Sequence, residues 1–237
     1  MRQLIAVIAA CLSLGMPGGA AAGDTQSGAN VMRGWEAVGR LNISGRNMCT
    51  GALVAPNLVV TAAHCLFDPQ TGVRVDPRTI RFEAGLRGRQ AKAARQVDKA
   101  VLHPQYRYGR SGLNQMGSDL AVLRLAQPIS RSHIQPFATA GGAERGDTVG
   151  VMSYSYSHAT RPSLESACQV LARQSKTLVM SCRVDYGASG SPVFEMRPGR
   201  APRLVSVISA KAAMGNRRVS IGSALDGSLV ALMRRAG

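Results

Sequence analysis

Three short segments, far apart in the chain, carry residue types that together could activate a serine hydroxyl. His64 lies in TAAHC, Asp119 in SDLAVLRL and Ser189 in GASGSPV. A serine hydroxyl is a poor nucleophile until a base removes its proton, and a neutral imidazole suits that task near pH 7. A carboxylate can fix the imidazole tautomer and stabilise the imidazolium. The pattern predicts nucleophilic hydrolysis with Ser189 as nucleophile, His64 as general base and acid, and Asp119 as the orienting group.

Each segment alone has a plainer structural interpretation. A histidine after a strand is usually structural, an aspartate before a strand often caps a turn, and G-x-S-G is a common loop composition. The three in the order His, Asp, Ser are much harder to dismiss. Other residues of the same types lack a comparable motif or an adjoining apolar strand: Asp98, His103, His133, His158, Asp185 and Ser191.

The glycine before the serine has a role of its own in this interpretation. Gly187 permits a backbone turn that aims its own N–H and that of Ser189 at one point. Two such donors stabilise the oxyanion that develops when a carbonyl is attacked, and losing one typically costs on the order of 10²–10³ in rate.

The elements that must position these residues are mostly short strands. Apolar runs punctuated by Gly, Pro, Asn and Asp favour an all-β sandwich or barrel, with 127–139 as a connection between two barrels and 153–163 as an exposed loop. Asp226 caps one short C-terminal helix. The predicted strands are 37–43, 51–55, 58–61, 79–84, 121–125, 149–153, 168–172, 178–183, 192–195 and 204–210.

The N-terminus reads as a targeting segment. Residues 1–22 combine Arg2, an apolar stretch and an A-x-A site, as in a secretory signal peptide that is removed. The alternative is lipidation at Cys11, because the residues before it resemble a bacterial lipobox. Removal of the leader predicts a secreted or periplasmic protein.

Cysteine usage agrees with export. Cys49, Cys65, Cys168 and Cys182 form an even set for an oxidising compartment, and no C-x-x-C spacing points to a metal. Cys49 and Cys65 are equidistant from one predicted turn, and Cys168 and Cys182 from another. Because residues equidistant from a hairpin turn face each other, we predict disulfides 49–65 and 168–182. Each closes a loop of about 15 residues, which stabilises by roughly 3 kcal/mol in the chain-entropy account.

The charge is strongly basic, with 29 Lys and Arg against 13 Asp and Glu and a formal net charge of +16. Such a chain is attracted to anionic surfaces of any kind. The basic residues are scattered and no nucleic-acid-binding signature occurs, so we expect no dedicated nucleic-acid site. Two rival functions rest on this charge: a catalytically silent relative of such a hydrolase that binds anionic cell-envelope polymers, and an exported nucleic-acid-binding protein.

TAAHC, DLAVLRL and GASGSPV together resemble the trypsin/chymotrypsin-like serine proteases, most closely the small bacterial branch that includes glutamyl endopeptidases. The resemblance covers roughly residues 31–233. It implies an all-β fold of two Greek-key six-stranded β-barrels with a cleft between them. We expect one barrel over 31–130, carrying His64 and Asp119, and a second over 131–237, carrying Ser189 and followed by the helix.

The same resemblance implies polypeptide substrates, a monomer, no cofactor and no metal. It leaves a short segment, 23–30, that is either kept or trimmed. Ala188 stands where digestive members carry an aspartate that pairs with a new N-terminus, so that activation switch is unavailable.

The resemblance also places three residues at the primary substrate pocket. Arg183 falls at its base, and Ser209 and Lys211 fall along one wall, which lacks the histidine found in glutamyl endopeptidases. A cation at the bottom of the pocket argues against cleavage after Lys or Arg. It favours an acidic residue before the cleaved bond.

Overall fold

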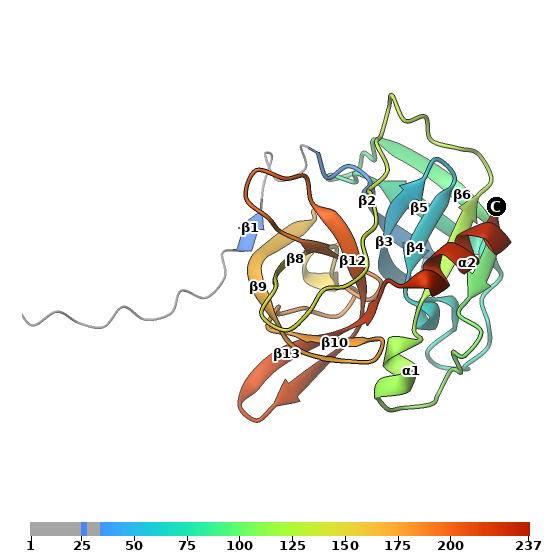
Figure 1. Ribbon diagram of the computed structural model, residues 1–237. Coiled ribbons are helices and arrows are strands. Elements are labelled where there is room, and N and C mark those ends of the chain that lie inside the picture. Colours follow the sequence, from blue (N-terminus) through green and yellow to red (C-terminus); the bar gives the residue numbers. More distant parts are fainter. Residues whose placement is uncertain (1–24, 28–33) are drawn as a thin grey trace, which may run out of the picture.

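The computed structural model describes residues 25–27 and 34–237 (Figure 1). The predicted leader 1–22, with Cys11, and most of segment 23–30 lie outside the described residues. Two closed six-stranded antiparallel barrels make up the fold, which confirms the predicted class. The first closes in the order β2 (Val38–Ile43), β3 (Asn47–Ala55), β4 (Leu58–Thr61), β7 (Ala121–Leu125), β6 (Ala93–Leu102) and β5 (Ile80–Ala84).

The second barrel closes through the pairing of β8 with β9, and the three-residue strand β1 (Thr25–Ser27) adds to the other edge of β9. In Figure 1 the long β12–β13 hairpin projects from this barrel. Its strands are β8 (Thr148–Ser153), β9 (Ser163–Gln174), β10 (Thr177–Met180), β13 (Arg217–Ala224), β12 (Arg203–Met214) and β11 (Pro192–Glu195).

Most strands fall where the sequence predicts them, because their apolar runs are buried on both faces or on alternate positions. β4 is buried along its whole length, and β7 at all but one position. Three strands were not predicted: the three-residue β1, β6 and β13. β6 carries three charged residues in ten, although Val97 and Val101 are buried, and β13 begins Arg217-Arg218 and continues with Ser and Gly.

The helices are short. The predicted C-terminal helix is α2 (Gly227–Ala236), and the Asp226 carboxylate accepts the Ser228 N–H at its start. α1 (Leu113–Gly117) was not predicted, and the remaining turns are 3₁₀ helices at Ala63–Leu66, Pro77–Thr79 and Tyr156–His158. None of the helices within the described residues is both long and apolar enough to cross a membrane.

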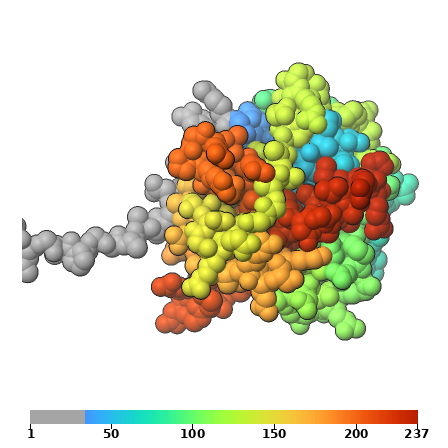
Figure 2. Space-filling view, viewed as in Figure 1, coloured from blue at the N-terminus to red at the C-terminus, as the bar shows by residue number. Residues whose placement is uncertain are grey.

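The C-terminal helix crosses back onto the first barrel. α2 packs against β6 and β7, and its buried residues Leu229, Leu232 and Ala236 join the first barrel's core. Figure 2 shows it lying across the green and cyan atoms of that barrel. The same core takes in Tyr154 from the end of β8, so apolar packing continues across the barrel interface.

Both predicted disulfides are present. Cys168 and Cys182 have Cα atoms 5.1 Å apart, and Cys49 and Cys65 have Cα atoms 6.3 Å apart. Cys65 lies in the 3₁₀ turn after β4 and not on the strand itself, so the hairpin argument located the bond without describing its geometry. A ring nitrogen of His64 lies within 4.8 Å of both sulfur atoms of the first bond, but a disulfide offers no thiolate to a metal.

Candidate active site

His64 and Asp119 meet because their strands are neighbours. β4 pairs with β7 in a register that sets Thr61 opposite Ala121, so the residues just after β4 and just before β7 lie at the same end of the barrel. His64 Nδ1 lies 2.7 Å from Asp119 Oδ2, and the His64 backbone N–H donates to Oδ1 at 2.8 Å. The carboxylate therefore fixes both the ring and the turn that carries it, with the proton on Nδ1 and the Nε2 lone pair free.

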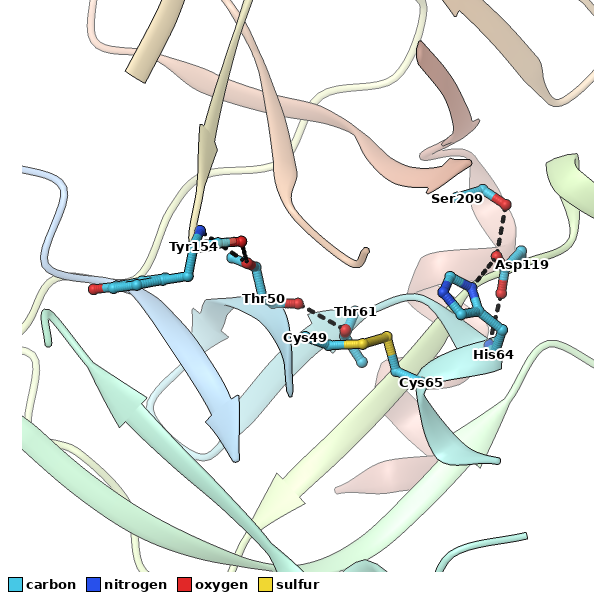
Figure 3. Close-up of a disulfide and its surroundings, with 8 residues drawn as sticks. All are labelled: Cys49, Thr50, Thr61, His64, Cys65, Asp119, Tyr154 and Ser209. Carbon is cyan, nitrogen blue, oxygen red and sulfur yellow. Dashed lines mark hydrogen bonds and ion pairs between the residues drawn. A yellow bond between two sulfur atoms is a disulfide. The ribbon is translucent and has the colours of Figure 1, made fainter. Parts of the chain in front are cut away.

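Residues of the second barrel complete the surroundings of Asp119. The Ser209 hydroxyl, on β12, donates to Asp119 Oδ2 at 2.6 Å (Figure 3). The Ser223 hydroxyl, on β13, lies 2.5 Å from the Met116 carbonyl and 3.1 Å from the Asp119 backbone carbonyl. Asp119 is only 3% exposed, so the donors on its carboxylate, from His64 and Ser209, replace the water that its charge has lost.

The pKa of the His64 imidazole is raised above its ordinary value. Burial is the largest influence and lowers the pKa, because it disfavours the charged ring. The charge of Asp119 and its hydrogen bond to Nδ1 both act in the opposite direction, and together they raise the pKa above the ordinary value of 6.5.

Ser189 comes from the loop between β10 and β11 and is pressed against the first barrel. Its backbone carbonyl accepts the Thr50 N–H at 2.8 Å. Gly190 follows with φ of +77°, and a Cβ there would collide with Thr61 Oγ1 and with the Thr50 carbonyl. Only glycine fits between the nucleophile loop and β3 at this point.

The structure joins His64 to Asp119, but it does not join Ser189 to His64 by a hydrogen bond. Among the described residues the half-buried Ser189 hydroxyl has no hydrogen-bond partner. Catalytic hydrogen bonds of this kind are often long without substrate and tighten in the complex.

Two backbone donors in the same loop are free. The N–H groups of Ala188 and Ser191 donate to Asp185 and Ala188 carbonyls. Within the part of the chain that the structure describes, the N–H groups of Gly187 and Ser189 have no acceptor. Gly187 has φ of +94°, and a Cβ there would lie 3.0 Å from the Tyr156 nitrogen, so glycine is required.

A cavity of about 570 Å³ lies beside this loop, and three cations reach it. Arg183 and Lys211, two of the three predicted pocket residues, line this cavity, whereas the Ser209 hydroxyl is turned to Asp119 and Ser209 is not part of the lining. Arg218 is an addition that sequence reasoning missed. The lining residues are Arg183, Val184, Asp185, Lys211, Ala212, Arg218 and Val219.

One carboxylate partly offsets the cations of this cavity. Asp185 Oδ1 lies 3.8 Å from Lys211 Nζ, which also sits 3.3 Å from the centre of the Tyr186 ring. The pKa of Asp185 is lowered, first by the hydrogen bond from the Tyr186 N–H and to a smaller extent by Lys211 and Arg218. Three cations against one anion leave the cavity positive.

Two antiparallel six-stranded barrels, with a histidine–aspartate pair on one and a serine loop on the other, define a chymotrypsin-like fold. Residues 26–224 match the family described as Trypsin, and the chain belongs to this family of trypsin-like serine proteases. The predicted family is therefore confirmed.

Comparisons with individual proteins agree. The chain is 31% identical to human Serine protease 56 over 96 residues, which are 40% of this chain and 14% of that protein. It is 31% identical to Trypsin of Phaedon cochleariae over 84 residues, 35% of this chain and 29% of that protein. The matches thus span less than a third of either relative's length.

Solved structures show the same fold at low identity. A Glu endopeptidase in complex with MPD superposes with a TM-score of 0.72 at 17% identity, covering 90% of this chain and 95% of that one. The protease Anisep from Arthrobacter nicotinovorans has a TM-score of 0.70 at 17% identity, covering 90% and 99%. The thermostable serine protease AL20 from an extremophilic microorganism has a TM-score of 0.68 at 18% identity, covering 85% and 97%.

Proposed function

We propose that this protein is an exported serine endopeptidase that works through an acyl-enzyme on Ser189. The observation that carries the proposal is the 2.7 Å bond between His64 Nδ1 and the buried Asp119. That bond leaves Nε2 free to take a proton in a family whose members are serine proteases. Export is supported by the two disulfides, which persist in oxidising compartments.

The reaction follows from these groups. His64 Nε2 takes the Ser189 hydroxyl proton as the oxygen attacks the scissile carbonyl carbon, and the N–H groups of Gly187 and Ser189 receive the oxyanion. His64 then gives the proton to the leaving amine, which departs as the C–N bond breaks. Water repeats the sequence on the ester and frees Ser189.

The experiment that tests the proposal is covalent labelling. A fluorophosphonate should add once to the folded, leader-free protein, and peptide mapping should place the adduct on Ser189. The same protein unfolded in denaturant should remain unlabelled, because activation depends on the assembled site. A folded protein without an adduct would favour the alternative of a silent, polyanion-binding protein.

The raised pKa of His64 predicts the acid limb of the pH profile. His64 must be neutral to accept the Ser189 proton, and Asp119 holds it protonated to a higher pH than usual. The rise of kcat/KM with pH is therefore expected at a midpoint above the ordinary histidine value of about 6.5. Initial rates on a neutral peptide between pH 5 and 9 measure it, and a midpoint below 6 would contradict the assignment.

We also propose that the cavity lined by Arg183, Lys211 and Arg218 selects an acidic residue before the cleaved bond, because these cations outnumber Asp185. Arg218→Ala is expected to lower kcat/KM about tenfold for a glutamate peptide, as the loss of one charge-assisted hydrogen bond implies. The glutamine analogue should be cleaved by both proteins at similar rates. Arg217→Ala is the matched control, since Arg217 is the neighbouring cation outside the lining. Equal losses for both peptides would contradict selection by charge.

A further inference from the structure

Thr50, a fully buried residue of β3, bonds to the second barrel with both its backbone and its side chain. Its backbone N–H donates to the Ser189 carbonyl at 2.8 Å. Its hydroxyl donates to the Tyr154 carbonyl at 3.2 Å and accepts the Tyr154 N–H at 3.0 Å (Figure 3). One residue of the first barrel therefore holds the backbone of two segments of the second.

Tyr154 is a firm anchor for such a bond. It is 0% exposed, its ring lies in the core of the first barrel, and its phenol donates to the Leu86 carbonyl at 3.0 Å. The backbone that Thr50 pins leads directly to Tyr156, whose N–H donates to the Tyr186 carbonyl beside Gly187. The Thr50 hydroxyl therefore holds the backbone segment that contacts the Ser189 loop, where the two free N–H groups lie.

Thr50 is also tied to the turn that carries His64. The Thr61 hydroxyl, at the end of β4, donates to the Thr50 carbonyl at 2.8 Å. Cys49, the preceding residue, is bonded to Cys65, which follows His64. Figure 3 shows these links in one continuous chain from Tyr154 to the His64 turn.

We infer that Thr50 is a positioning residue, whose hydroxyl sets the register between the barrel that carries His64 and the barrel that carries Ser189. The inference rests on the proposed function. It assigns Thr50 no contact with substrate: the hydroxyl satisfies the buried N–H and C=O of Tyr154, and a methyl in its place would leave both unpaired. Those groups would then shift to find partners, and a misplacement of about 1 Å between reacting groups can cost about 10²-fold in rate.

The test compares three changes at this residue with one elsewhere. Thr50→Val keeps the shape without the hydroxyl, and Thr50→Ala removes the hydroxyl without adding apolar bulk. Both are expected to lower kcat, and the rate of fluorophosphonate labelling, by about 10²-fold, with KM changed less than threefold. Thr50→Ser keeps the hydroxyl and should restore kcat to within about threefold. Ser206→Ala removes a buried hydroxyl bonded within the second barrel, to the Ser223 carbonyl, and should leave kcat unchanged.

The outcomes separate this inference from the function on which it rests. An active wild type, with both hydroxyl-free variants within threefold of its kcat, overturns the role of Thr50 alone. Loss of kcat in Thr50→Ser or in Ser206→Ala as large as in Thr50→Ala overturns it too, because any buried change would then suffice. A wild type that neither cleaves peptides nor takes the label overturns the proposed protease function.

Discussion

Replacing Ser189 with alanine is expected to lower kcat on a peptide substrate by about 10⁶-fold, with KM changed only a few-fold. The change removes the oxygen that attacks the carbonyl. It leaves the N–H groups of Gly187 and Ser189 and the cations of the cavity in place, so substrate still binds and the oxyanion donors still act. Residual hydrolysis by water is then all that remains.

Ser191→Ala is the matched control for this change. Ser191 lies two residues along the same loop and is fully buried, and its hydroxyl has no hydrogen-bond partner among the residues that the structure describes. Its removal should leave kcat within a few-fold of wild type. Steady-state rates, with the intact mass after fluorophosphonate treatment, decide the matter. A labelled Ser189→Ala protein, or one with wild-type kcat, would show that another residue is the nucleophile.

Asp119→Asn is expected to lower kcat by about 10⁴-fold. The carboxylate now accepts from His64 Nδ1, from the His64 backbone and from Ser209. An amide can present its NH₂ to Nδ1, which favours the tautomer with the proton on Nε2. That ring cannot accept the Ser189 proton, and no negative charge remains beside the imidazolium.

The same substitution should also move the acid limb of the pH profile. Asp119 is the group that raises the His64 pKa against the effect of burial, so in Asp119→Asn burial is left to lower that pKa. Asp98→Asn serves as control, because Asp98 pairs with Arg124 at the surface of the first barrel and lies away from His64. A full rate profile for each protein is the measurement. An unchanged midpoint in Asp119→Asn would contradict the assigned pairing.

The three candidate catalytic residues could be predicted because each lies in a motif of a few adjacent residues. His64, Asp119 and Ser189 stand in short motifs at the ends of apolar runs, and the short, β-branched apolar runs of β4 and β7 are typical of buried strands. The same reasoning failed for β6, because its apolar pattern is interrupted by charged residues, namely Arg95, Asp98 and Lys99. Its strand identity comes from pairing with β5 and β7, which propensity does not record.

Residues that enter the site through pairing were out of reach of sequence reasoning. Arg218 reaches the cavity because β13 pairs with β12 and sets Arg218 opposite Ala213, and β13 itself was not predicted. Ser209 was placed on the correct strand, but its bond to Asp119 depends on how the two barrels dock. The bonds of the Thr50 hydroxyl to Tyr154 also depend on how the barrels dock, and the residues adjacent to Thr50 in the sequence give no sign of them.

The C-terminal helix connects the two barrels a second time, because it follows the second barrel in the chain and packs on the first. The chain leaves the first barrel through residues 126–147, builds the second, and returns through α2 to bury Leu229, Leu232 and Ala236 against β6 and β7. The barrels can therefore move fully apart only if α2 leaves the first barrel and the connection 126–147 extends. With one link broken, the other still holds the halves at a high effective concentration. Re-docking is then a local search at little entropic cost, and the surfaces that meet near Thr50 find the same partners each time.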